Sequence, residues 1–120
     1  MIHRKIVRHV DLQTIPSCPI TADLYLFKGD NGAIRWEIIV TDGGANVDLT
    51  DLTIRAAAKL PGGQLITIEG ITIEENRITI TIPAACCTET GELITTCTAT
   101  DGSSTLTLDH MHTYIHDKEV

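Results

Sequence analysis

The sequence has few aromatic residues, and Tyr25, Phe27, Trp36 and Tyr114 are the whole set. A stacking platform for nucleic-acid bases or sugar rings is difficult to build from so few rings. The hydrophobic core must therefore be aliphatic. Threonine and isoleucine together supply 35 of the 120 residues, and such β-branched side chains favour strands over helices. Composition predicts a single all-β domain, which this length can support without metals or disulfides.

Long apolar runs are also missing. No segment approaches the roughly 20 apolar residues of a membrane-spanning helix, and His3, Arg4 and Lys5 interrupt the place where a secretory signal needs its apolar run. The net charge is −7, although Arg4, Lys5 and Arg8 make the first ten residues basic. An acidic body argues against nucleic-acid binding, which requires clustered Lys and Arg. We expect partners that are neither membrane nor nucleic acid.

The four cysteines form no recognisable zinc or disulfide pattern. They are Cys18, Cys86, Cys87 and Cys97, with no C-x-x-C pair among them. Adjacent Cys86 and Cys87 cannot both face one partner on a regular strand. Cys97 shares the strand parity of Leu93, which suits a small buried hydrophobe. We predict reduced, structural thiols.

Alternation of apolar and polar residues with a period of two recurs along the chain. Turn residues, above all glycine with Asp or Asn, separate the alternating runs. Residues 84–90 are the only stretch where a short helical turn is plausible. The expected strands cover residues 2–10, 20–26, 34–40, 54–60, 64–69, 71–73, 78–82, 93–100 and 105–115, with a short extended piece at residues 47–50. Short strands at such regular intervals predict a β-sandwich or a barrel.

The last predicted strand contains a conflict of parity. Leu106 and Leu108 indicate one inward face, whereas Met111 and Ile115 indicate the opposite face. A shift of one residue moves every side chain to the other side of a sheet. We therefore predict a bulge or a change of pairing partner near residues 109–110.

Prolines divide the chain near its start. Pro16 and Pro19 mark a linker over residues 11–19, so we predict an N-terminal arm and linker (1–19), a sandwich (20–116) and a short tail (117–120). The arm carries a basic strand over residues 2–10 that could add to the sheet of another subunit. The alternative is a solvated terminal strand. The predicted partner-binding residues are Ile2, Arg4, Lys5, Ile6, Arg8 and Val10.

The histidines are the best candidates for chemistry. His110, His112 and His116 lie at even spacings, so an unbroken strand projects them to one side. An H-x-H pair is half of a metal site, especially where subunits meet around a symmetry axis. No Cys, Asp or Glu is placed by the sequence to complete that site. We predict no metal and no cofactor, with His110 and His112 as the residues that would form a metal site.

Nucleophilic catalysis finds no support in the sequence. The serines are Ser17, Ser103 and Ser104, and none lies in a G-x-S-x-G elbow. The Gly43-Gly44 and Gly62-Gly63 pairs lie in turns that open no helix, so they do not form phosphate-binding loops. We predict that the protein is not an enzyme.

Residues 33–116 resemble the immunoglobulin-like N-terminal domain of the baseplate upper protein and related fibre anchors of tailed bacteriophages. The resembling segments are, in order, AIRWEIIVTDGG, VDLT, LTIRAAAKLPGGQLI, RITITIP and GELITTCTATDGSS. Each piece alone is weak, and their order is the more specific signal. A basic N-terminal extension precedes the match.

This resemblance implies an immunoglobulin-like antiparallel β-sandwich, here with an extended N-terminal arm, that carries no catalytic residues. It implies a virion structural protein that joins or covers larger assemblies such as capsid, neck, baseplate or fibre. The implied partners are other virion proteins and copies of the chain itself, in a homo-oligomer or symmetric assembly. The alternative is an immunoglobulin-like module that binds host-surface carbohydrate or protein. Tyr25 with Phe27 is then the candidate aromatic pair, whereas Trp36 alternates with isoleucines and belongs in the core.

Overall fold

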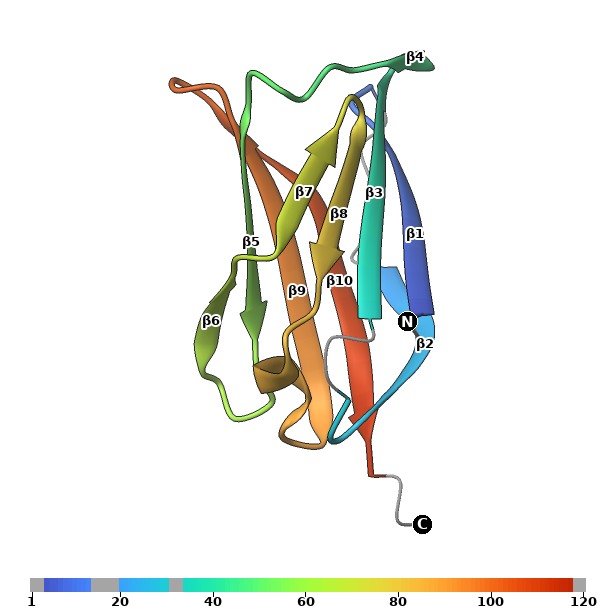
Figure 1. Cartoon of the computed structure of the whole chain (residues 1–120), viewed down its shortest axis with the longest axis vertical. Coiled ribbons are helices and arrows are strands. Elements are labelled where there is room, and N and C mark those ends of the chain that lie inside the picture. The colour runs from blue at the N-terminus through green and yellow to red at the C-terminus, as the bar shows by residue number, and fades with distance from the viewer. Residues whose placement is uncertain (1–3, 14–19, 31–33, 118–120) are drawn as a thin grey trace.

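A computed structural model describes residues 4–13, 20–30 and 34–117, with the backbone alone for residues 20–25. Within these residues, two sheets pack face to face as a β-sandwich (Figure 1). The first sheet has the order β1 (Arg4–Asp11), β3 (Ile34–Asp42), β8 (Arg77–Thr81) and β7 (Ile71–Glu74), and β4 (Ala45–Asn46) pairs with β3. The second has the order β2 (Ile20–Phe27), β10 (Thr105–His116), β9 (Gly91–Thr100), β5 (Thr53–Lys59) and β6 (Leu65–Ile68). The predicted all-β sandwich is confirmed.

The sheets are mixed, where the sequence predicted antiparallel pairing throughout. β1 runs parallel to β3, and β2 runs parallel to β10. Their other pairings are antiparallel. Tight hairpins make sequential neighbours antiparallel, and hairpins do join β5 to β6 and β7 to β8. Because β1 and β2 reach their partners without a hairpin, the turn pattern of the sequence carried no information about their direction.

The predicted boundary at residue 20 differs from the structure. β1 pairs with β3 along its whole length, from Arg4 opposite Ile34 to Asp11 opposite Thr41. It is therefore the edge strand of the first sheet, and the sandwich already includes it. Half-buried Ile6 and Val10 pack against the core and hold the strand there. Ile2 and residues 14–19 of the predicted linker lie outside the described residues.

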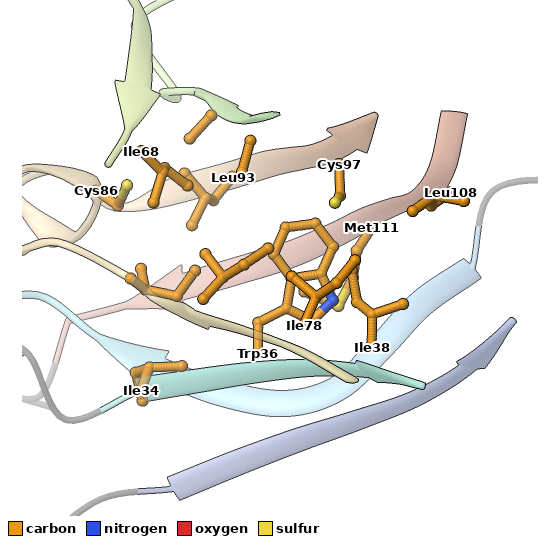
Figure 2. Close-up of a cluster of buried hydrophobic side chains, with 14 of the residues drawn as sticks. Ile34, Trp36, Ile38, Ile68, Ile78, Cys86, Leu93, Cys97, Leu108 and Met111 are labelled. Carbon is orange, nitrogen blue, oxygen red and sulfur yellow. The ribbon is translucent and has the colours of Figure 1, made fainter. Parts of the chain in front are cut away.

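The core lies between the sheets and is aliphatic, as the scarcity of rings required. Trp36 is completely buried at its centre, which confirms its predicted place (Figure 2). Alternation in β3 places its inward residues in the core as predicted, and β8, β9 and β10 supply the facing side chains. The fully buried large residues are Leu26, Trp36, Ile38, Val40, Leu49, Ile68, Ile78, Ile80, Leu93, Thr95, Met111 and Ile115.

A short 3₁₀ helix over Ala84–Cys87 lies inside the stretch predicted to allow a helical turn. Its Cys86 and Cys87 are buried free thiols, as is Cys97 in β9. Burial raises the pKa of Cys86 and Cys97 to about 12 and that of Cys87 to about 11. These three cysteines are therefore neutral structural residues, as predicted, and Cys18 lies outside the described residues.

The predicted bulge is present in β10. The pairing of β10 with β9 shifts between Thr107 and Asp109, so that Leu108 and Asp109 both point inward. Leu106, predicted to face inward, is 52% exposed. The extra residue resolves the parity conflict, because it lets Met111 and Ile115 enter the core beyond it. No helix in the described part of the chain is long and apolar enough to cross a membrane.

Candidate interaction surfaces

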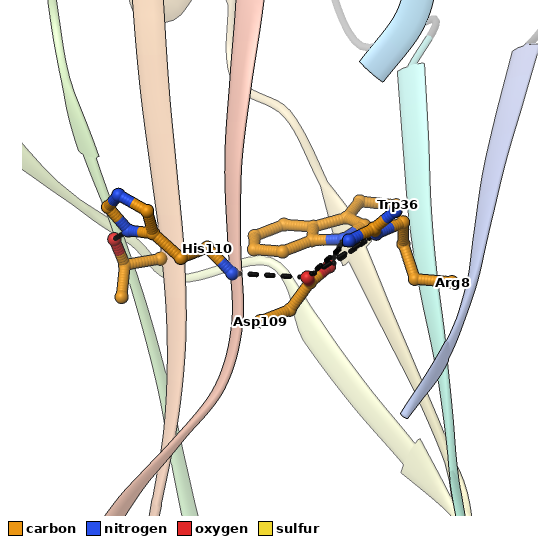
Figure 3. A network of polar contacts seen from close by, with 5 residues as sticks. Arg8, Trp36, Asp109 and His110 are labelled. Atoms are coloured by element: carbon orange, nitrogen blue, oxygen red, sulfur yellow. Dashed lines mark hydrogen bonds and ion pairs between the residues drawn. The ribbon is translucent and has the colours of Figure 1, made fainter. Parts of the chain in front are cut away.

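A charged residue lies almost buried where β10 bulges. Asp109 is 6% exposed and accepts hydrogen bonds from Arg8 Nε at 3.0 Å, Arg8 Nη2 at 3.0 Å and Trp36 Nε1 at 2.9 Å (Figure 3). The backbone amide of His110 is the fourth donor, at 3.1 Å. A buried carboxylate is tolerated only when its oxygens are paired in this way.

This network joins the two sheets. Arg8 comes from β1 and Trp36 from β3 in the first sheet, whereas Asp109 comes from β10 in the second. The guanidinium of Arg8, predicted to contact a partner, is thus engaged within the chain and only 18% exposed. The arrangement positions an edge strand, and sequence analysis missed it because Asp109 faces inward only after the bulge.

The outer face of β1 carries the exposed residues Lys5, Val7 and His9. Lys5 Nζ lies 3.4 Å from Glu37 Oε2, and Arg77 Nη1 lies 3.6 Å from the other oxygen of the same carboxylate. Glu37 is 6% exposed on this outer face because its neighbours cover it. Val7, between Lys5 and His9 on this face, is 48% exposed and takes no part in these ion pairs.

The end of β1 is tied to the turn that follows β3. Asp11 accepts hydrogen bonds from the backbone amides of Gln13, Gly43 and Gly44 and from the hydroxyl of Thr41. The amide of Gln13, the hydroxyl of Thr41 and the amide of Gly44 lower the pKa of Asp11 to about 2. Gly43 and Gly44 have φ angles of 61° and 91°, which glycine adopts without strain. The turn predicted at the Gly43-Gly44 pair is confirmed, and the Asp11 carboxylate accepts hydrogen bonds from the amides of both glycines.

Of the other predicted partner-binding residues, Lys5 is exposed, whereas Ile6 and Val10 are half-buried on the inner face of β1. Arg4 is exposed and is engaged within the chain. Because β1 ends the sheet order, no described strand pairs with its other edge. This edge is the part of the predicted surface that no described strand covers.

A row of imidazole and phenol rings follows the outer face of β10. The ring centroids of His110 and His112 are 5.2 Å apart at 74°. The ring of His116 lies 5.0 Å from that of Tyr114 and 6.1 Å from that of Phe27. The histidines therefore share one side of the strand, as their spacing predicted. The described residues contain no group of three or more His, Cys, Asp or Glu arranged to hold a metal.

Neighbouring β9 fixes two of these rings. His110 Nδ1 lies 2.9 Å from Thr96 Oγ1, and His112 Nδ1 lies 3.0 Å from Glu92 Oε2. No sequence pattern marks Glu92 and Thr96 as contacts of the two histidines, because these contacts depend on the register between β9 and β10. Of the predicted aromatic pair, Phe27 is half-buried and the Tyr25 side chain lies outside the described side chains. Among the described rings of this region, Tyr114 is exposed, at 56%.

An apolar pocket of about 240 Å³ opens at the end of the sandwich beside the bulge. Leu106 and Leu108 line it from β10, and Asp101 and Ser104 lie among its polar residues. The Asp101 carboxylate accepts bonds from the amides of Ser103 and Ser104, and these amides lower its pKa. Asp101, Ser103 and Ser104 thus stabilise the turn between β9 and β10.

The described residues form a two-sheet β-sandwich in which polar side chains stabilise the edge strand β1 and several turns. No family model and no curated protein matches the sequence. Among solved structures, the N-terminal domain of phage TP901-1 ORF48 is similar, with a TM-score of 0.56 and 8% sequence identity. The similarity covers 93% of this chain and 98% of that chain. At this identity the similarity establishes the fold.

Proposed function

We propose that the protein is a structural component of a phage virion that joins or covers larger assemblies through protein–protein contacts and performs no catalysis. The observation that carries the proposal is the similarity to a phage protein domain over 93% of one chain and 98% of the other. Because the similarity extends over nearly all of both chains, it involves the whole domain. A shared hairpin or turn motif would match only a short segment. The segment order noted in the sequence is consistent with the same class of domain.

The edge of β1 supplies a mechanism for such contacts. An edge strand presents a row of unpaired amide and carbonyl groups that can accept another strand. β1 is eight residues long, and the Arg8–Asp109 pair and the Asp11 turn hold its backbone in place. A strand fixed in this way loses little conformational freedom when a partner strand is added. The partner is another virion protein or a second copy of the chain.

The acidic residues support a structural role. Asp109 pairs with Arg8, Asp11 closes the turn after β3, and Asp48 accepts bonds from the amide and hydroxyl of Thr50. Each of these carboxylates stabilises the backbone around it. Glu37 likewise pairs with Lys5 and Arg77. Each of these carboxylates therefore has a partner within the chain, and none requires a substrate to account for its position.

A reconstitution experiment tests the proposal. Purified protein is mixed with phage particles that lack it, and sedimentation measures binding. Wild-type protein is expected to bind particles and Val7→Lys to bind at least tenfold more weakly, because Val7 is an exposed apolar side chain of the edge strand β1, at 48%, and the lysine removes apolar surface that a partner strand would bury. Leu65→Lys is the matched control: Leu65 is an exposed apolar residue, at 72%, on the edge strand β6 of the other sheet. Absence of wild-type binding would refute the structural role.

A second candidate function rests on the exposed Tyr114 ring, which lies beside His116 and Phe27. Exposed aromatic rings are common in sites that bind sugars or protein side chains. Under this alternative, Tyr114→Ala abolishes binding to host-cell surfaces while binding to virion particles is unchanged. Unchanged host-surface binding by this variant would remove the alternative.

A further inference from the structure

The outer face of β10 carries a pair of histidines whose surroundings suit metal binding. His110 and His112 project from the same side of the strand, with ring centroids 5.2 Å apart and an interplanar angle of 74°. Both are partly exposed, and the side chain of His112 is 26% exposed. Solvent and ions therefore reach the pair.

The distance between the rings fits shared coordination. A metal ion about 2.1 Å from a ring nitrogen lies about 3.2 Å from the centroid of that ring. Two imidazoles at a tetrahedral angle around one ion therefore have centroids about 5 Å apart. The observed separation of 5.2 Å agrees with this value.

The contacts of Nδ1 with β9 are compatible with free Nε2 atoms in both rings. Glu92 Oε2 lies 3.0 Å from His112 Nδ1, and a carboxylate can only accept, so Nδ1 carries the proton. In the neutral ring, Nε2 then holds the free lone pair. The hydroxyl of Thr96 lies 2.9 Å from His110 Nδ1 and can accept a bond in the same way. Metal-binding histidines characteristically donate the other ring N–H to a carboxylate or another oxygen.

We propose that His110 and His112 bind one divalent transition-metal ion, such as Zn²⁺, Ni²⁺ or Cu²⁺, through their Nε2 atoms. Imidazole ligands select these ions over Mg²⁺ and Ca²⁺, which prefer oxygen. Glu92 and Thr96 act as positioning residues that fix the rings. Water supplies the remaining ligands, because Glu92 is engaged by Nδ1 of His112 and the described part of the chain contains no group of three or more His, Cys, Asp or Glu that could hold a metal.

Calorimetric titration of the untagged full chain carrying His3→Gln with NiCl₂ tests the proposal, because a free N-terminal amine with histidine at position 3 can itself chelate Ni²⁺ and Cu²⁺ in a square-planar nitrogen site. We expect one ion per chain, an affinity at least tenfold lower in both His110→Gln and His112→Gln, and no change in His9→Gln or His116→Gln. With Cu²⁺, electron paramagnetic resonance is expected to show two coordinating imidazole nitrogens, reduced to one in either single variant. CaCl₂ is expected to give no binding heat.

Glu92→Ala separates positioning from ligation. We expect Ni²⁺ affinity to fall about 10-fold or more while the Cu²⁺ spectrum keeps two nitrogens. Thermal unfolding without metal confirms that each variant is folded, and Ni²⁺ is expected to raise the melting temperature of wild-type protein more than that of either Gln variant. Binding that survives His110→Gln unchanged, a single coordinating nitrogen in wild type, or no Ni²⁺ binding at all would overturn the proposal.

Discussion

The space between the two sheets is closed differently on its two sides. Towards β8 and β9 it is filled by apolar residues, with Ile78, Ile80 and Leu93 fully buried. Towards β1 it is closed by the ion pair of Arg8 and Asp109. Trp36 belongs to both regions, because its ring lies among the aliphatic residues and its Nε1–H bonds to Asp109 (Figures 2 and 3).

The difference shows how one sandwich obtains stability and register from separate regions. Apolar packing stabilises any arrangement that fills the volume. The apolar side, towards β8 and β9, therefore does not by itself fix how β1 aligns with β3. A bidentate pair has a fixed geometry. A slip of β1 by two residues would keep its inner parity, with Ile6 or Val10 in the place of Arg8, but it would leave Asp109 without its partner. We infer that the charged side selects the alignment and the apolar side supplies most of the free energy.

The largest expected effect comes from breaking the charged side. Asp109→Ala leaves Arg8 and the indole N–H of Trp36 without their acceptor, and we expect a loss of about 3–5 kcal/mol in the free energy of unfolding. Arg8→Met with Asp109→Ala removes both charges and leaves mainly the indole unsatisfied, so the double variant is expected to lose about 1–3 kcal/mol. Urea denaturation measures both. A double variant no more stable than Asp109→Ala would contradict this account.

On the apolar side, Ile78→Ala is expected to cost about 2–4 kcal/mol and Ile78→Val about 1 kcal/mol, through lost burial and the cavity left behind. Unlike Asp109→Ala, these changes leave the alignment of β1 intact. Hydrogen exchange of the β1 amides is therefore expected to increase more in Asp109→Ala than in Ile78→Ala, after correction for global stability. Equal increases would remove the proposed division between the two sides.

Cys97 lies at the border of the two regions, opposite Asp109. Burial, and then the charge of Asp109, raise the pKa of this thiol from 9 to about 12. Because the unfolded chain loses this proton first, stability is expected to fall as the pH rises from about 9 to 12. The slope contributed by one thiol is at most about 1.4 kcal/mol per pH unit. Cys97→Ala is expected to give a shallower alkaline loss in a pH series of thermal melts than wild-type protein.

The smallest effect concerns the end of β1. The pKa of Asp11 is lowered from 3.8 to about 2, so its contribution to stability is present above pH 4 and is lost as the pH falls towards 2. Asp11→Asn is expected to lower the melting temperature slightly at pH 7 and to match wild type near pH 2. Glu74→Gln, on the edge strand of the same sheet, is the control. A difference that persists at pH 2 would contradict the assignment.

The sequence predicted the strands well because alternation is a local signal. The inward residues of β3 and the isoleucines of β8 follow from period two alone, and the conflict between Leu108 and Met111 located the bulge to within two residues. The choice of a neighbouring strand within the sheet depends instead on residues far away in the sequence. Nothing in residues 4–11 indicates that they pair with β3 of the same chain, since an amphipathic strand fits any open edge.

The polar contacts were beyond prediction for the same reason. Asp109 and Arg8 are 101 residues apart, and the acceptor of His112 comes from β9, 20 residues away. Both contacts depend on register, which the sequence does not specify. Glu37 lies on the outer face of β3, and its ion pairs with Lys5 and Arg77 come from two other strands, so they too depend on register.

The bulge in β10 has a consequence for changes in chain length. Thr107 pairs with Thr98 and Asp109 pairs with Cys97, the next residue of β9, so Leu108 is an insertion between two consecutive rungs. Removing Leu108 would leave each of those rungs in place. The histidines would stay outside and Asp109 inside, and the change would be confined to the pocket that Leu108 lines. One position in the strand can therefore absorb a deletion while both faces of the sheet keep their residues.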